Sequence, residues 1–118
     1  NLVEMSYGSV FSLRLVGVLG ESVMSSVNWA EVIQKSIAAG VEVDSLLDDL
    51  QALGLKIEPF TVEEGEMTGR LWAQTRQGGL SLGDRACLSL GVRLGVPVLT
   101  GDRAWASLNL SVKVEVIR

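Results

Sequence analysis

The chain contains 118 residues, of which 47% are apolar and 20% are charged, with 13 glycines and only 2 prolines. This length accommodates one domain, and this composition excludes collagen-like and disordered chains. Because Cys87 is the only cysteine and histidine is absent, the sequence also excludes an internal disulfide, zinc fingers, haem sites and catalytic triads that use histidine. Any chemistry must use carboxylates, hydroxyls or the backbone.

The formal net charge of −4 argues against a broad basic surface for nucleic acids. Residues 60–118 nevertheless hold seven Lys and Arg residues against six acids, which leaves room for a local basic surface. No apolar run reaches the roughly 18–20 residues that span a bilayer. The chain also opens without the pattern of a secretory signal, so we expect a cytoplasmic protein.

Residues 1–20 carry apolar side chains at a spacing that favours one or two helical turns over a strand. Four short runs rich in β-branched residues follow, and four longer segments with helical patterns accompany them. The predicted strands are 23–26, 55–60, 97–100 and 112–117, and the predicted helices are 29–39, 45–53, 62–77 and 84–94.

Strands separated by helices indicate crossover connections, a parallel sheet covered on both faces, and therefore an α/β fold. Four glycines stand where these helices should end and are predicted to supply a left-handed residue there. They are Gly40, Gly54, Gly78 and Gly95.

Three acids occupy comparable places in this predicted fold. Glu31 and Asp102 follow predicted strands, and Asp84 begins a predicted helix. Since the carboxyl ends of parallel strands and the following helix starts share one edge of a sheet, the three carboxylates can converge there. Two charges about 4 Å apart repel by roughly 4 kcal/mol at an effective dielectric constant of about 20. Clustered carboxylates would therefore hold protons or a hard cation such as Mg²⁺ or Mn²⁺.

Helix capping is the simpler interpretation of the same acids. Asn28 with Glu31, and Ser81 with Asp84, both have the spacing of a capping box, as has the segment 61–64, for which we claim no chemistry. Asp102 has an equally good interpretation as the N-cap of a short helix. Spacing alone cannot separate the two interpretations.

Other candidate residues carry weaker signals. Cys87 is predicted to be a small core residue, because no histidine is present to activate it. For the three tryptophans, packing in the core is favoured over stacking on bases. Arg85 and Arg103 each follow a candidate acid, and we expect both side chains to be solvated. No glycine-rich phosphate loop follows a strand.

Two segments of the second half, 80–88 (LSLGDRACL) and 95–105 (GVPVLTGDRAW), resemble the distal part of a PIN domain. The likeness is greatest to the VapC-like ribonuclease toxins of VapBC-type toxin-antitoxin systems. A third segment, 24–32 (MSSVNWAEV), is similar to the second motif of the same family. The resemblance implies a single PIN-like domain over residues 1–118, with a parallel sheet between helices in a three-layer sandwich.

The resemblance also implies a function. In the family, four acids hold one or two divalent ions, Mg²⁺ or Mn²⁺, and water is directed at an RNA phosphodiester bond. Glu31 matches the second acid, Asp84 the third and Asp102 the fourth, with the hydroxyl of Thr100 beside the last one. The implied partners are an RNA substrate, a cognate antitoxin protein that blocks the site, and a second copy of the chain in a homodimer.

The beginning of the chain departs from the family pattern. The family's first acid lies in an opening, central strand, whereas the first aspartate here is Asp44, and Glu4 lies too far along to match. We therefore expect a sheet without its central strand. Either an earlier stretch of chain precedes Asn1, or this is a degenerate member. The sequence thus predicts a metal-dependent endoribonuclease toxin, with a PIN-like binding module that lacks the first acid as the alternative.

Overall fold

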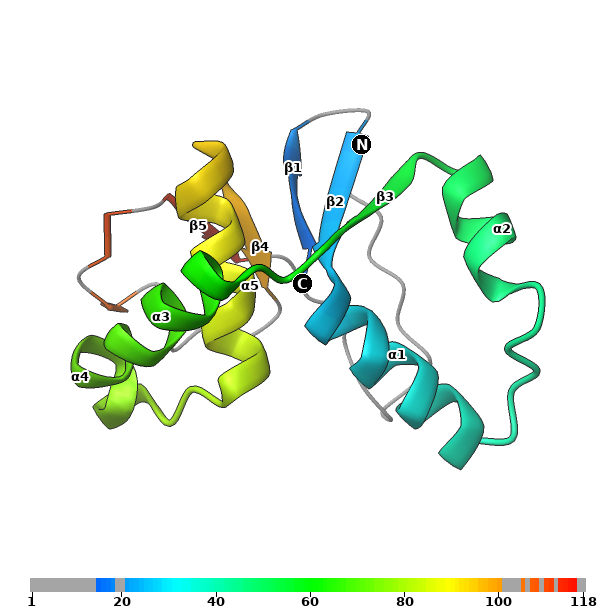
Figure 1. The fold of residues 1–118 in the computed structure, drawn as a ribbon, viewed down its shortest axis with the longest axis horizontal. Coiled ribbons are helices and arrows are strands. Elements are labelled where there is room, and N and C mark those ends of the chain that lie inside the picture. Colours follow the sequence, from blue (N-terminus) through cyan, green and yellow to red (C-terminus); the bar gives the residue numbers. More distant parts are fainter. Residues whose placement is uncertain are drawn as a thin grey trace.

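The computed structural model describes residues 15–18, 21–100, 105, 107–108, 110–111 and 113–116. Within this part of the chain, groups of helices lie between short strands (Figure 1). The elements are β1 (Leu15–Val18), β2 (Glu21–Ser25), α1 (Ser26–Ala38), α2 (Leu46–Ala52), β3 (Leu55–Glu58), α3 (Val62–Arg70), α4 (Trp72–Thr75), the 3-10 helix η1 (Arg76–Gly78), α5 (Leu82–Leu94), β4 (Val98–Thr100) and β5 (Val114–Val116).

The strands form one sheet in the order β3-β2-β1-β4-β5. The pairs β2 with β3 and β4 with β5 are parallel, whereas β1 is antiparallel to both of its neighbours. Strands β2 to β5 therefore all run in one direction, as the sequence predicts, and β1 alone among the described strands runs in the opposite direction. Because of β1, the sheet is mixed.

The expected gap in the centre of the sheet is filled by β1, which is a correction of the prediction. Its residue Val16 pairs with Val23 of β2 and with Val98 of β4. The helical interpretation of residues 1–20 is wrong for β1; the segment 1–14 lies outside the described residues. A run of four residues with two valines is too short for periodicity to separate helix from strand. Pairing on both sides then favours the strand, because it satisfies backbone groups that would otherwise be buried without partners.

The first of two buried clusters lies on the sheet face that α1 and α2 cover. Neighbouring residues in a strand point to opposite faces of a sheet, and Met24 of β2 and Leu99 of β4 point to this one. Val32 of α1 and Leu46 and Leu50 of α2 complete the cluster. These contacts hold α1 and α2 beside β2 and β3, on the right in Figure 1.

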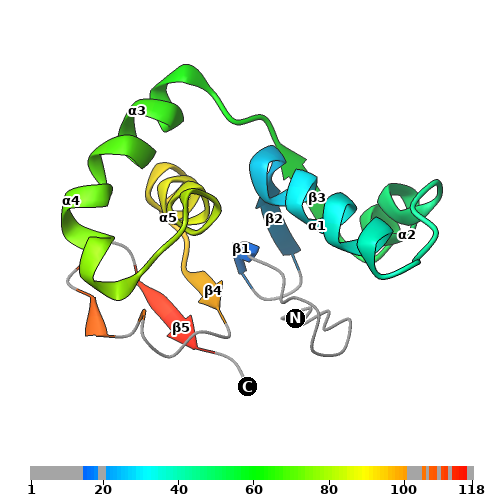
Figure 2. The same ribbon diagram turned by 90° about the horizontal axis from the view of Figure 1, so that it is seen from below.

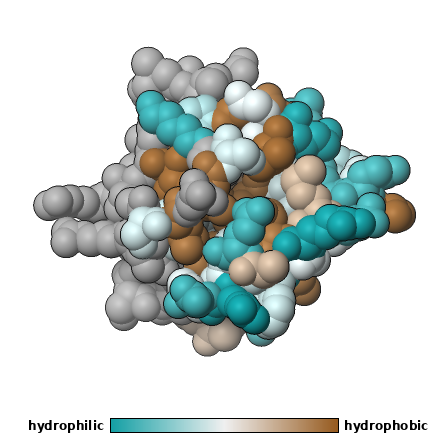
Figure 3. Space-filling model, turned by 90° about the vertical axis from the view of Figure 1, so that its left-hand side faces the viewer, coloured by the Kyte–Doolittle hydropathy of each residue, from teal (hydrophilic) through white to brown (hydrophobic). Residues whose placement is uncertain are grey.

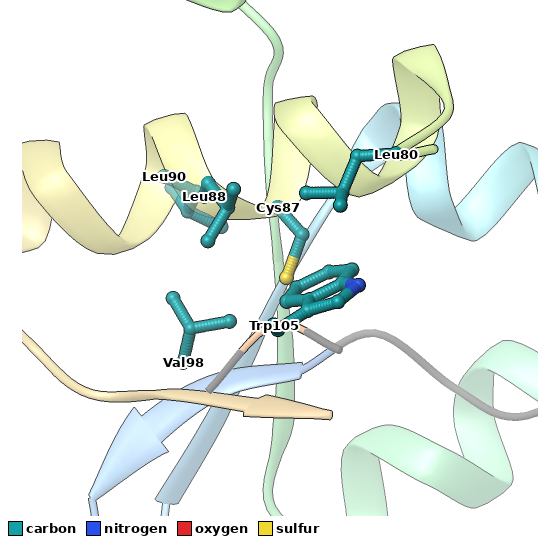
Figure 4. Packing of buried hydrophobic residues seen from close by; sticks show 6 residues of the cluster. All are labelled: Leu80, Cys87, Leu88, Leu90, Val98 and Trp105. Atoms are coloured by element: carbon teal, nitrogen blue, oxygen red, sulfur yellow. The ribbon is translucent and has the colours of Figure 1, made fainter. Parts of the chain in front are cut away.

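The second cluster lies on the opposite face, under α5. Figure 4 shows Val98 of β4 pointing toward Leu88 and Leu90 of α5, with Cys87 directly above the ring of Trp105. Cys87 and Trp105 are both fully buried, so both are core residues, as predicted. Viewed from below, α5 lies between α3 and α1 (Figure 2) and contacts both. The sheet with helices on both faces confirms the predicted α/β class.

The helix boundaries differ from the prediction: α1 begins at Ser26 and α5 at Leu82, where the prediction has 29 and 84. The predicted helix 62–77 is divided at Leu71 into α3 and α4, followed by η1. The left-handed residue that closes η1 is Gly79, at φ 70°, and not Gly78. The other three predicted glycines do have positive φ, and Gly95 directly follows α5 in a left-handed conformation, as a helix C-terminus favours.

Candidate functional site

Glu31 is an internal residue of α1, and the capping-box interpretation of Asn28 and Glu31 is wrong. The helix begins at Ser26, and its N-cap is Ser25, whose hydroxyl accepts a hydrogen bond from the backbone N–H of Val27. Asn28 and Glu31 therefore lie about one turn apart on the same face of α1. The side-chain amide Nδ2 of Asn28 donates to Oε1 of Glu31 over 3.0 Å.

This face of α1 contacts the first turn of α5. Nδ2 of Asn28 also donates to the backbone carbonyl of Gly83 over 2.9 Å. The Glu31 carboxylate lies directly against Gly83, so that a Cβ atom added there would be 2.6 Å from Oε2 and 2.7 Å from the carboxyl carbon. Only a glycine at position 83 leaves room for the carboxylate in this position. The contact brings Glu31 to the residue that precedes Asp84.

Asp84 caps α5, as one of the two interpretations predicts. The hydroxyl of Ser81 accepts from the backbone N–H of Asp84 over 3.1 Å, and Oδ2 of Asp84 accepts from the N–H of Ser81 over 3.0 Å. A carboxylate has about four acceptor sites, so a cap through Oδ2 does not exclude metal binding. The positive end of the α5 dipole also stabilises negative charge in this turn.

The other two predicted site residues have different outcomes. Thr100 is fully buried at the carboxyl end of β4. Since β2 and β4 run in the same direction, this end shares a sheet edge with the start of α1. Asp102 lies outside the described residues, as does Arg103. Among the residues that the structure describes, no three acids, cysteines or histidines lie close enough together to hold a metal ion.

The donors near Gly83 suit a hard cation. They are carboxylate oxygens, which Mg²⁺ and Mn²⁺ prefer. In the described ranges, no Lys or Arg forms an ion pair with Glu31. Arg85, which directly follows Asp84 in the sequence, turns toward α3, where its Nη1 donates to the carbonyl of Thr68 over 2.9 Å. The prediction that Arg85 is solvated is therefore wrong. The residues present fit a divalent metal ion.

Asn28 is a further residue of this site, and the sequence alone does not identify it. The side chain is 2% exposed, although asparagine is rarely buried. The signal was the spacing of three residues between Asn28 and Glu31, which also places two side chains in contact within a helix. The same spacing also fits a capping box, so the sequence alone does not distinguish the two.

The tryptophans differ in their environments. Trp105 is buried in the second cluster, and Trp29 is partly buried against the first. Trp72 is 51% exposed and lies beneath the guanidinium of Arg76, 5.3 Å from the ring centroid. The core prediction is therefore wrong for Trp72.

Two adjoining hollows lie away from these acids. Figure 3 shows apolar residues gathered among hydrophilic ones on the side of the molecule that carries α3 and α4. One hollow of about 230 Å³ is lined by Met67, Arg70, Leu71, Gln74, Val92 and Ser111. Its neighbour, of about 520 Å³, extends along the C-terminal end of α5. Glu31 and Asp84 lie at the opposite end of that helix and line neither hollow.

No helix in the described part of the chain has the length and apolar character that crossing a membrane requires. Comparisons with curated proteins and with solved structures gave no match. A comparison with protein families did: the family model described as PIN domain matches residues 2–109. The match includes all three segments that carry the resemblance, and it spans most of the chain. The chain therefore belongs to the PIN domain family.

Proposed function

We propose that this chain is a divalent-metal-dependent endoribonuclease and the toxin of a toxin-antitoxin system. PIN domains are generally metal-dependent nucleases, and membership of the family supports a hydrolase. The observation that carries the proposal is the contact of the Glu31 carboxylate with Gly83, next to Asp84. This contact places two acids in neighbouring helix turns, although they are 53 positions apart in the sequence, at 31 and 84.

Glu31, Asp84 and Asp102 would hold Mg²⁺ or Mn²⁺, with Thr100 as a supporting hydroxyl. A divalent ion supplies two things at such a site: a bound water with a lowered pKa, and positive charge beside the phosphate. The chain's own residues fix the carboxylates in place. Asn28 donates to Glu31, and Ser81 and the first turn of α5 hold Asp84. Hydrolysis at this site needs no histidine, which agrees with the composition.

The proposed substrate is RNA, and the proposed partners are a second copy of the chain and an antitoxin that covers the acids. An acidic protein binds RNA when a metal ion and a few arginines provide local positive potential. These proposals rest on the likeness of segments 24–32, 80–88 and 95–105 to VapC-like toxins.

The direct test is cleavage of a panel of structured RNAs by the purified protein with Mg²⁺, with Mn²⁺ and with EDTA. We expect cleavage only with metal, and a loss of at least about tenfold in Glu31→Gln, Asp84→Asn and Asp102→Asn, the lower end of the range for groups around a metal. Asp48→Asn is the matched control, since Asp48 is an exposed acid of α2. It should cleave like the wild type.

A second assay tests the toxin role. Induced expression of the wild-type chain in bacteria should stop growth, and Asp84→Asn should relieve the arrest at an equal protein level. If the wild-type protein binds RNA and cuts none of the panel in either metal, the alternative of a PIN-like binding module replaces the nuclease. If it cuts RNA and does not affect growth, the result supports the nuclease proposal and contradicts the toxin role.

A further inference from the structure

We propose that Asn28 is a positioning residue that fixes Glu31 against the first turn of α5, and that it does so through a single amide group. This inference rests on the proposed function, because Glu31 is taken as a metal ligand. Asn28 itself is not assigned to the metal. Its role is to determine where the Glu31 carboxylate lies relative to Asp84.

The geometry that supports this role is a double hydrogen bond. Nδ2 of Asn28 donates to Oε1 of Glu31 over 3.0 Å and to the carbonyl of Gly83 over 2.9 Å. The first bond is within α1, and the second joins α1 to α5 across 55 positions of sequence. One amide nitrogen thus connects the side chain of Glu31 to the backbone that carries Asp84. Rotation of the Glu31 side chain away from Gly83 would break the first bond.

The chemistry of the amide suits a ligand to a cation. A Lys or Arg at this position would also hold the carboxylate, but its positive charge would oppose a metal ion at the same oxygens. The neutral amide donates a hydrogen bond and leaves the full negative charge on Glu31. Carboxylates that bind metals are in turn held by hydrogen bonds from a second layer of residues, and these partners set both orientation and affinity.

The burial of Asn28 is a further reason to assign it a positioning role. Its Oδ1 is buried and has no hydrogen-bond partner among the described residues. A buried acceptor without a donor is unfavourable, and an apolar side chain of similar shape would avoid that cost. Turning the amide over would be worse, because Oδ1 would then face two acceptors, Glu31 Oε1 and Gly83 O. The function of Asn28 at this position is therefore to donate hydrogen bonds through Nδ2.

The first experiment measures this coupling in the full chain without metal. Thermal unfolding in EDTA is followed for Asn28→Ala, Glu31→Ala and the double variant. If Asn28 holds Glu31, the loss of melting temperature in the double variant is smaller than the sum of the two single losses. Asn28→Leu, which keeps most of the side-chain volume, repeats the cycle in case the alanine variant does not fold. Thr68→Ala combined with Glu31→Ala is the control, and its losses should add.

The second experiment measures Mn²⁺ binding by calorimetry, at a temperature where every variant is folded. We expect Asn28→Ala and Asn28→Leu to bind Mn²⁺ about 10- to 100-fold more weakly than the wild type. In the Glu31→Ala background, the same changes should have little further effect. Thr68→Ala removes a buried hydroxyl that bonds Ser89 on α5, and it should lower stability while leaving Mn²⁺ affinity unchanged.

The outcomes separate the two proposals. Additive losses in EDTA overturn the positioning role, whatever the metal result. Coupled losses with unchanged Mn²⁺ affinity in Asn28→Ala also overturn it, because Asn28 would then be structural only. If the losses are coupled but the wild type binds no Mn²⁺ at all, Asn28 does hold Glu31 and the proposed nuclease is what fails. Coupled losses with weakened Mn²⁺ binding support both.

Discussion

The carboxylate of Glu31 occupies the space that a side chain at position 83 would fill. A Cβ atom on Gly83 would lie 2.6 Å from Oε2 of Glu31, which is too close for both groups to keep their places. Gly83→Ala should therefore displace Glu31 and lower the affinity for Mn²⁺ by about 10-fold or more. Calorimetric titration of the variant with Mn²⁺ measures the effect.

A glycine in another helix provides the control for this substitution. Gly69 of α3 has no atom within 4 Å of an added Cβ. Gly69→Ala should raise the free energy of unfolding by about 0.5–1 kcal/mol, the usual gain in a helix, and leave Mn²⁺ binding unchanged. Equal Mn²⁺ affinity in both variants would show that Glu31 does not need the space at Gly83.

Asp84 has two proposed roles, which two substitutions can separate. Ser81→Ala removes the N-cap acceptor of α5 and should cost about 1 kcal/mol of stability with a smaller effect on metal binding. Asp84→Asn keeps a side chain of the same shape at the cap, so it should cost less stability but lower Mn²⁺ affinity strongly. Urea denaturation and Mn²⁺ titration of both variants give the comparison. If Ser81→Ala and Asp84→Asn lose stability and Mn²⁺ affinity in the same proportion, the two roles of Asp84 are not separate.

The elements that sequence patterns predict well are those with strong local signals. The four predicted strands and their common direction are correct, because short β-branched runs between helices leave few other arrangements. Strand β1 could not be predicted, since its four residues carry no period of their own and it forms through pairing with β2 and β4. Its antiparallel direction to β2 agrees with the two positions that separate the strands, because only antiparallel strands can be joined by so short a connection.

The start of α1 shows why spacing alone misassigned Glu31. Ser25, Ser26 and Asn28 are all good N-cap residues, and the sequence does not indicate which of them ends the strand. The cap is Ser25, which places Asn28 and Glu31 inside the helix. Glu31 is then positioned by a contact with Gly83, which is more than fifty positions away in the sequence. A local sequence pattern cannot predict a contact between residues so far apart.

Glu64 is another residue whose environment the local sequence does not predict. It lies in the segment 61–64, where Thr61 accepts from its backbone N–H, but its carboxylate turns inward. The side chain is 2% exposed and forms an ion pair with Arg93 of α5. Arg93→Met should leave a buried charge unpaired and cost about 3 kcal/mol, the low end of the range for breaking a buried pair, because Arg93 is itself 38% exposed.

The control for Arg93 is an ion pair on the surface of α3. Arg70 and Glu66 are 78% and 70% exposed, and such pairs contribute at most about 1 kcal/mol. Arg70→Met should therefore change the urea midpoint little, whereas Arg93→Met should shift it strongly. If Glu64→Leu combined with Arg93→Met restores the midpoint, the unpaired charge was the cause. A midpoint for Arg93→Met close to that of Arg70→Met would contradict the buried pair.

Trp105 and Trp72 carry the same side chain in opposite environments, which gives the last prediction. Trp105 is fully buried against Cys87 and Leu88, so Trp105→Ala should cost about 3–5 kcal/mol through lost contacts and a cavity. Trp72 is 51% exposed and its ring contacts Arg76, so Trp72→Ala should cost only about 0.5–1 kcal/mol from the lost cation–π contact. Urea denaturation followed by circular dichroism measures both, because it does not depend on tryptophan fluorescence. The core under α5 supports the helix whose first turn contains Asp84. Trp105→Ala should therefore also weaken Mn²⁺ binding, and Trp72→Ala should not.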